Sequence, residues 1–175
     1  MTKSASVEID TKLLPGRCLV DTGVLIRAMG QFEDETAGLC QAFFDAMVKS
    51  KNKRMYVAAP TVAEMLRGNP QPLPRTRSLV VVSFDNSAAE LLGTEIPVRV
   101  LKELRANTGL SLSYLKYDAM IVACAKRWNV ECIVALDTDH VVLATHVNMP
   151  VNHPRDFIHR QTRLQLVEIA ANSDS

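Results

Sequence analysis

The sequence lacks an apolar run long enough to span a bilayer, and residues 1–16 lack the sustained apolar segment that marks a secretory signal. It also has no C-x-x-C motif. Its widely spaced cysteines lie among apolar neighbours, which argues against a zinc site or a disulfide framework. They are Cys18, Cys40, Cys124 and Cys132. These absences predict a cytoplasmic protein that keeps its thiols reduced and does not associate with a membrane.

Motifs of nucleotide-dependent enzymes and zinc proteases are absent as well. The chain has no G-x-x-x-x-G-K-[ST], no G-x-G-x-x-G and no H-E-x-x-H. Its histidines show no spacing typical of metal ligands, so ordinary surface or core roles are favoured for them. They are His140, His146, His153 and His159. What is present is a chain of 175 residues, 47% hydrophobic and 22% charged, which is the balance of a single globular domain.

The net charge of +1 gives the protein no general attraction for nucleic acid, but its basic residues are unevenly distributed. Residues 49–77 contain seven basic residues and one acid, and residues 99–127 contain six basic residues and two acids. The first group is Lys49, Lys51, Lys53, Arg54, Arg67, Arg75 and Arg77, and the second is Arg99, Lys102, Arg105, Lys116, Lys126 and Arg127. Each group is either a phosphate-binding surface or an ordinary solvated face.

Apolar runs rich in β-branched residues alternate with segments of helical period, which predicts an α/β fold around a mostly parallel sheet. The expected strands are residues 17–21, 55–59, 79–84 and 131–136, with a weaker fifth near 146–151. The expected helices are residues 35–50, 86–107 with a break or kink at Pro97, 114–128, and 154–170. The helix over 114–128 is apolar almost all round, so it should be the most buried.

Acidic residues fall at the ends of several of these elements. Asp21 and Asp137 close the first and fourth strands, Asp139 follows two residues later, and Glu64 lies five residues past the second strand. The carboxyl ends of parallel strands form one rim, where ligands bind. Asp118 lies near the start of a helix that runs back toward that rim. We therefore expect these carboxylates to converge.

Converging carboxylates repel one another unless their pKa values shift or a cation binds. Hard oxygen ligands suit Mg²⁺ or Mn²⁺, ions that activate water and neutralise phosphate oxygens during phosphodiester cleavage. The pattern therefore predicts a divalent-cation site.

Each acid also has a structural alternative. Asp21 can cap the helix that follows it, and Asp137 can belong to a turn. Thr61-x-x-Glu64 matches a helix capping box. Asp118 is the hardest to explain this way, because an unpaired carboxylate in so apolar a helix costs several kcal/mol. A neighbouring lysine or backbone group can still be its partner.

Four segments carry a resemblance to a known family: CLVDTGVLI, AAPTVAEMLRG, YDAMIVACAKRWNVECIVALDTDH and MPVNHPRDFI. They resemble PIN-domain nucleases, in particular the VapC-type toxins of toxin–antitoxin pairs, over about residues 18–158. The resemblance implies an α/β/α sandwich with a central sheet of four to five strands. We expect a flexible leader over residues 1–16, the PIN domain over 17–160, and a helix end and tail over 161–175.

The resemblance also implies an endoribonuclease that cleaves RNA phosphodiester bonds with water activated by Mg²⁺ or Mn²⁺. It assigns the metal to carboxylates at five positions, the last one auxiliary: Asp21, Glu64, Asp118, Asp137 and Asp139. Thr22 and Thr61 are expected to lie beside these ligands and orient them. The implied partners are an RNA substrate, a cognate antitoxin and a second copy of the chain.

Three positions depart from the family's usual pattern without removing a carboxylate. Gly23 stands where Asn is frequent, Ala135 where Thr is frequent, and His140 where Phe is frequent. An inactive PIN-like module that binds RNA or protein therefore remains an alternative, although the complete acid set argues against it. Tyr114 and Tyr117 can stack on bases, but packing is the favoured use.

Overall fold

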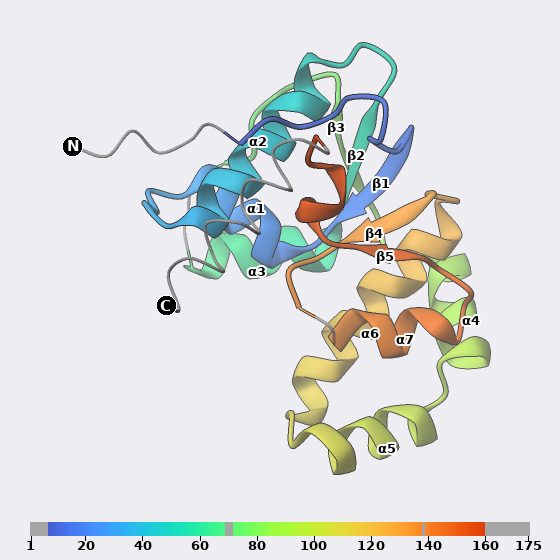
Figure 1. The fold of residues 1–175 in the computed structure, drawn as a ribbon. Helices are drawn as coiled ribbons and strands as arrows, with labels where there is room; N and C mark the ends of the chain where they lie inside the picture. The colour runs from blue at the N-terminus through green and yellow to red at the C-terminus, as the bar shows by residue number, and fades with distance from the viewer. Residues whose placement is uncertain (1–6, 69–71, 138, 160–175) are drawn as a thin grey trace, which may run out of the picture.

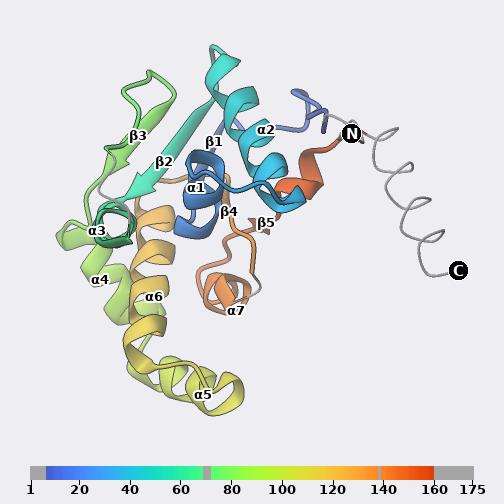
Figure 2. The same ribbon diagram turned by 90° about the vertical axis from the view of Figure 1, so that its left-hand side faces the viewer.

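A computed structural model describes residues 7–68, 72–137 and 139–159. Its five strands form one sheet in the order β3-β2-β1-β4-β5, and every pairing is parallel (Figures 1 and 2). The strands are β1 (Arg17–Val20), β2 (Arg54–Ala58), β3 (Leu79–Val82), β4 (Cys132–Val134) and β5 (Val151–Asn152). The predicted parallel sheet is confirmed, and the weak fifth strand is a short edge strand.

Helices cover both faces of the sheet. They are α1 (Thr22–Met29), α2 (Glu35–Lys49), α3 (Ala59–Gly68), α4 (Asn86–Glu95), α5 (Val98–Thr108), α6 (Leu112–Arg127), α7 (Asp139–Thr145) and the 3₁₀ helix η1 (Pro154–Phe157). In β1, Cys18 and Val20 pack with α1, α2 and η1, whereas Leu19 packs with α4, α6 and α7. Alternate residues of β1 therefore pack on opposite faces of the sheet, and both faces are covered by helices. This arrangement confirms the α/β/α sandwich.

The segment after β3 forms two helices, as its proline predicts. α4 ends at Glu95, and Pro97 is the N-cap residue of α5. Proline lacks the backbone N–H that a continuous helix needs there. α5 packs against α6 and projects beyond the sheet (Figure 1). α5 ends at Thr108, and its C-cap residue Gly109 has a φ of 73°, which favours glycine.

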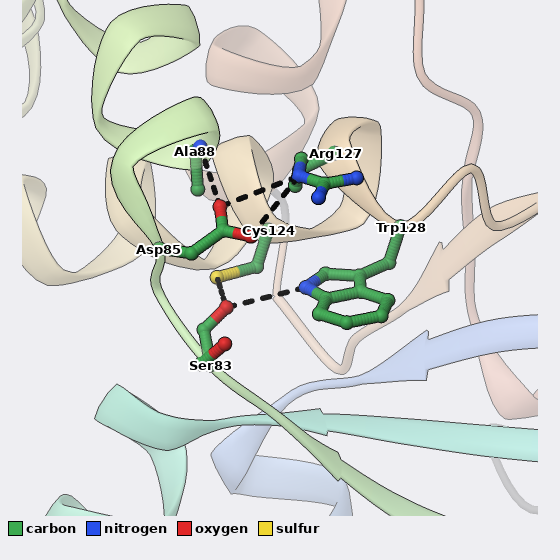
Figure 3. A network of polar contacts seen from close by, with 6 residues as sticks. All are labelled: Ser83, Asp85, Ala88, Cys124, Arg127 and Trp128. Atoms are coloured by element: carbon green, nitrogen blue, oxygen red, sulfur yellow. Dashed lines mark hydrogen bonds and ion pairs between the residues drawn. The ribbon is translucent and has the colours of Figure 1, made fainter.

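A polar network holds the carboxyl end of α6 against the connection between β3 and α4 (Figure 3). The Arg127 Nε–H donates to both carboxylate oxygens of Asp85, at 3.3 and 3.2 Å. The carbonyl oxygen of Ser83 accepts from the indole of Trp128 at 3.2 Å and from the thiol of Cys124 at 3.8 Å. These contacts fix the carboxyl end of α6 against the segment that follows the carboxyl end of β3.

Two expectations about the ends of the domain need correction. Pro154–Phe157 is a single 3₁₀ turn, and Ile158 is extended, so the helix predicted from Pro154 does not continue through this residue. Residues 160–170 of that helix lie outside the described residues. The loose leader expected over 1–16 does not hold for residues 7–16, because Ile9 bridges Ile158 and Leu14 is 3% exposed.

All four cysteines are free and buried. Burial raises the pKa of Cys124 and Cys132 to about 12, and Asp85 and Glu131 add to the effect. Among the described helices, none combines the length and the apolar character needed to cross a membrane.

Candidate active site

A cavity of about 230 Å³ opens at the carboxyl ends of the strands. Four of the predicted acids line it, each from a different segment: Asp21, Glu64, Asp118 and Asp137. Six other residues complete its lining: Thr22, Gly23, Ile26, Arg67, Tyr114 and Tyr117. The sheet is parallel and α6 returns to its rim, so residues far apart in the sequence share one cavity.

Asp21 lies between β1 and α1 and is 7% exposed. Its carboxylate accepts a hydrogen bond from the backbone N–H of Gly23 at 3.1 Å and thereby caps α1. The capping alternative is therefore correct, and it is compatible with a place in the cavity. A helix N-terminus favours negative charge, so the cap also helps to keep this buried group ionised.

Glu64 lies in the second turn of α3 and is exposed to the cavity. Its Oε2 accepts a hydrogen bond from Thr22 Oγ1 at 2.8 Å, so Thr22 orients Glu64. The capping box is not formed, because α3 begins at Ala59 and the buried hydroxyl of Thr61 has no hydrogen-bond partner among the described residues. Thr61 is buried one turn before Glu64, and its hydroxyl donates to no acid of the described chain.

The remaining acids differ in exposure. Asp118 lies in the second turn of α6 and is 5% exposed among apolar neighbours. Asp137 is exposed and lies between β4 and α7. Asp139 is the first residue of α7, and its side chain is outside the described part of the structure.

His140 is the residue of this site that the sequence patterns missed. It is 2% exposed in the first turn of α7. Its Nε2 lies 2.8 Å from Asp21 Oδ1, and its Nδ1 lies 3.8 Å from Asp118 Oδ1. The angles at Nε2 are not those of a directed hydrogen bond, so the short contact is an ion pair. Two signals in the sequence point to the rim: His140 lies three residues after the acid that follows β4, and it departs from the usual residue of the family at its position.

His140 and Asp21 shift each other's pKa values. Burial lowers the pKa of His140, but pairing with Asp21 and the charges of Asp118 and Asp137 outweigh burial and raise this pKa to about 9. Burial raises the pKa of Asp21, but His140 and the backbone N–H of Gly23 lower it overall. At neutral pH the protein therefore holds a positive charge between two of its acids.

The donor set can be tested against a divalent cation. The four acids offer hard carboxylate oxygens to one cavity, which suits Mg²⁺ or Mn²⁺. As the side chains stand, no three His, Cys, Asp or Glu residues of the described chain are grouped to hold one ion. His140 lies between Asp21 and Asp118, and the exposed Glu64 and Asp137 can rotate. The carboxylate oxygens are suitable ligands for a divalent cation, and they lie around one cavity. Their side chains have to move before three of them can bind the same ion.

Members of the two basic groups lie in different parts of the fold, and some of them already have partners. Arg67 lines the cavity, whereas Arg54 begins β2 at the opposite edge of the sheet. In the second group, Arg127 is paired with Asp85, and the Lys126 ammonium donates to a backbone carbonyl. Arg67 is therefore the basic residue best placed to meet a phosphate in the cavity.

The sequence matches the PIN domain family over residues 18–145. A search of curated proteins finds no match. Thirteen chains of solved structures match, among them one from the crystal structure of VapBC2 from Rickettsia felis bound to a DNA fragment from their promoter. That chain is 13% identical, with a TM-score of 0.52, and the match covers 78% of this chain and 98% of that one. At this identity the likeness shows the fold alone.

Proposed function

The chain belongs to the PIN domain family, and from this premise we propose that it is a metal-dependent endoribonuclease of the VapC toxin type. The reaction is hydrolysis of an RNA phosphodiester bond. The observation that carries the proposal is the convergence of four carboxylates on one cavity. Four carboxylates that share one cavity repel one another, and a bound cation relieves this repulsion.

In this proposal Asp21, Glu64, Asp118 and Asp137 bind Mg²⁺ or Mn²⁺, and Asp139 is auxiliary. When bound, the ion activates water and neutralises phosphate oxygens. Thr22 orients Glu64, because its hydroxyl donates a hydrogen bond to the Glu64 carboxylate. Arg67 brings positive charge to the same cavity.

We also propose a cognate antitoxin as partner, self-association into a homodimer, and action in the cytoplasm. The likeness of the fold to a chain of the VapBC2 structure supports an antitoxin partner. It does not bear on the RNA that is cleaved, because the readout of RNA depends on the shape of the loops around the cavity.

A catalytically inactive PIN-like module that binds RNA or protein is the second candidate. His140 favours it, because an imidazolium between Asp21 and Asp118 already supplies positive charge to these acids. Such a module needs no metal.

Cleavage of labelled RNA separates the two candidates. The unmodified protein, Asp21→Asn and Asp118→Asn are compared in Mg²⁺, in Mn²⁺ and in EDTA. Asp45→Asn is the matched control, because Asp45 is an exposed acid in α2 outside the cavity. The nuclease proposal expects cleavage by the unmodified protein and the control in metal only, with a loss of at least a hundredfold in the two site variants.

Equal cleavage by all four proteins would identify a contaminating nuclease and remove the support for activity. Failure of the unmodified protein to cleave a panel of RNAs, together with metal-independent binding of RNA, would establish the inactive module instead.

A further inference from the structure

The helix α5 projects beyond the sheet and carries basic residues that do not line the cavity (Figure 1). Arg99, Lys102 and Arg105 are exposed on it at intervals of three residues. The buried residues of the helix lie on its other side, and they are Val100, Leu101 and Leu104. Residues three apart share one side of an α-helix, so the three cations form a stripe about 9 Å long, which we call the α5 basic stripe.

The charges of the α5 basic stripe are available to a partner. None of its three residues takes part in an ion pair with another described residue. An ordinary solvated helix face places opposite charges three or four residues apart, where they pair. Arg99 and Glu103 have that spacing, yet they form no ion pair in the described chain. Glu103 is the one acid in the sequence of α5, so the helix keeps a net positive charge.

The α5 basic stripe is joined to the cavity by a segment without acids. α5 packs against α6, and residues 109–111 connect the end of α5 to the start of α6 (Figures 1 and 2). The first two turns of α6 then bring Tyr114 and Asp118 to the cavity. No charged residue occurs between Arg105 and Lys116 in the sequence. A polyanion that follows this segment from the cavity to the stripe therefore meets no negative side chain on it.

The side chains of the α5 basic stripe suit phosphates and not bases. Guanidinium and ammonium groups pair with a phosphate whatever base it carries, and several of them in a row suit an anion with repeated charges. α5 has no aromatic residue, so it offers no ring on which a base could stack. The stripe therefore fits the backbone of a nucleic acid.

We propose that the α5 basic stripe binds the phosphate backbone of RNA that extends away from the scissile bond. This inference rests on the proposed function, and it names the surface that holds the part of the substrate outside the cavity. Phosphate contacts position an RNA without reading its sequence. The stripe should therefore strengthen the binding of long RNA and leave the chemistry in the cavity unchanged.

Binding is measured by fluorescence anisotropy on a long fluorescein-labelled RNA of mixed sequence, over a range of salt concentrations. Ca²⁺ replaces Mg²⁺, and a gel verifies that the RNA stays intact. The triple variant Arg99→Gln/Lys102→Gln/Arg105→Gln should weaken binding roughly tenfold or more at low salt. Each lost phosphate contact lowers the slope of log Kd against log salt concentration by about one, so the slope should fall by about two to three.

Cleavage tests whether the α5 basic stripe acts outside the cavity. Initial rates are compared on the long RNA and on its shortest fragment that the unmodified protein still cleaves. In the triple variant, KM for the long RNA should rise roughly tenfold, in step with Kd. Its kcat should stay within about twofold, because no residue of the stripe lines the cavity. KM for the short fragment should not change, because this RNA has no contact with α5 to lose.

Two controls separate the α5 basic stripe from general electrostatics and from a structural role. The variant Lys12→Gln/Lys49→Gln/Lys51→Gln removes the same charge from three exposed lysines in the segments that lead into β1 and β2, away from the cavity. It should lower the salt slope by less than about one. The variant Arg99→Lys/Arg105→Lys keeps the charges of the stripe, so it should retain both the affinity and the salt slope.

The outcomes separate the α5 basic stripe from the proposed function. Equal salt slopes in the triple variant and the lysine control would overturn the stripe and leave the nuclease intact, as would an unchanged KM on the long RNA. If the unmodified protein binds RNA through the stripe but cleaves none in Mg²⁺ or Mn²⁺, the stripe stands and the nuclease proposal fails.

An acidic protein is the other partner that a basic helix face could bind. A fluorescein-labelled polyglutamate peptide tests it in the same anisotropy assay. If this peptide binds as tightly as RNA and loses its affinity in the triple variant, the assignment to RNA is overturned. If the unmodified protein does not bind RNA at low salt, the α5 basic stripe is not an RNA-binding surface.

Discussion

The ion pair between His140 and Asp21 should make the stability of the metal-free protein depend on pH. The pKa of His140 is about 9 in the folded protein and 6.5 without the fold. A raised pKa means that the folded chain holds the proton more tightly than the unfolded chain does. The resulting stabilisation is complete below pH 6.5 and is lost as the pH rises through 9.

The magnitude follows from the proton affinity. A tenfold change in that affinity is worth about 1.4 kcal/mol, so a pKa raised from 6.5 to about 9 corresponds to about 3 kcal/mol. Solvent screening does not reduce this figure much, because His140 is 2% exposed. The unmodified protein should therefore lose about 3 kcal/mol of unfolding free energy between pH 6 and pH 9.5 through this group.

Urea unfolding in EDTA, followed by circular dichroism at half-unit steps of pH, measures this loss. His140→Phe is the matched variant, because phenylalanine has a similar shape and no proton to lose. The raised thiol pKa of Cys124 and Cys132 also lowers stability above pH 9, but it does so in both proteins. The difference between the two curves therefore isolates His140.

Two results test the reasoning. If the curves of the unmodified protein and His140→Phe run parallel from pH 6 to pH 9.5, the imidazole is not charged in the folded state and the electrostatic account of the site is wrong. Asp21→Asn should move the loss toward lower pH, because it removes the largest contribution that raises the pKa of His140.

Two further variants test the packing that positions the site. Phe43→Ala removes a fully buried ring and should cost about 3–5 kcal/mol of unfolding free energy, whereas Phe32→Ala, at a position 49% exposed, should cost less than about 1 kcal/mol by urea unfolding. Asp85→Ala removes the cap of α4 and the partner of Arg127, and should lower the unfolding free energy by about 1–2 kcal/mol. Asp45→Ala, an exposed acid without a cap role, should leave it within about 0.5 kcal/mol.

The central strands were predictable because each is a short apolar run buried on both faces. β2 shows this well, since Met55 and Val57 pack on one helical layer and Tyr56 and Ala58 on the other. The order of the strands is set by contacts distant in sequence, such as Leu19 beside Ile133. No local pattern contains that information, which is why the sequence predicted a parallel sheet without its order.

The short length of η1 was not predictable for a related reason. Pro154 after a capping residue is the usual start of an α-helix, and local signals cannot show where it ends. The turn stops because Phe157 docks on the core, where its ring stacks on Phe43 with centroids 5.4 Å apart. Tertiary packing overrides the local preference.

The acids were predictable for the opposite reason, because a carboxylate next to a buried strand is conspicuous in any sequence. His140 was not, since its role arises only where α7 brings it between Asp21 and Asp118. Glu64 shows the limit of short motifs, because the Thr61-x-x-Glu64 pattern matches a capping box that the fold does not form. A short motif specifies residue types and their spacing, but the tertiary structure determines which of these residues are in contact.

The balance of charge in the cavity separates the two candidate functions. Four acids line it, against one lining arginine and one buried histidine, so the acids outnumber the bases by two. An RNA phosphate that approaches Arg67 in the metal-free protein therefore meets net repulsion. A divalent cation held by the acids would cancel it, so the nuclease should bind RNA at least tenfold more tightly in Ca²⁺ than in EDTA. An inactive module has to bind RNA without that help, and equal anisotropy curves in the two buffers would favour it.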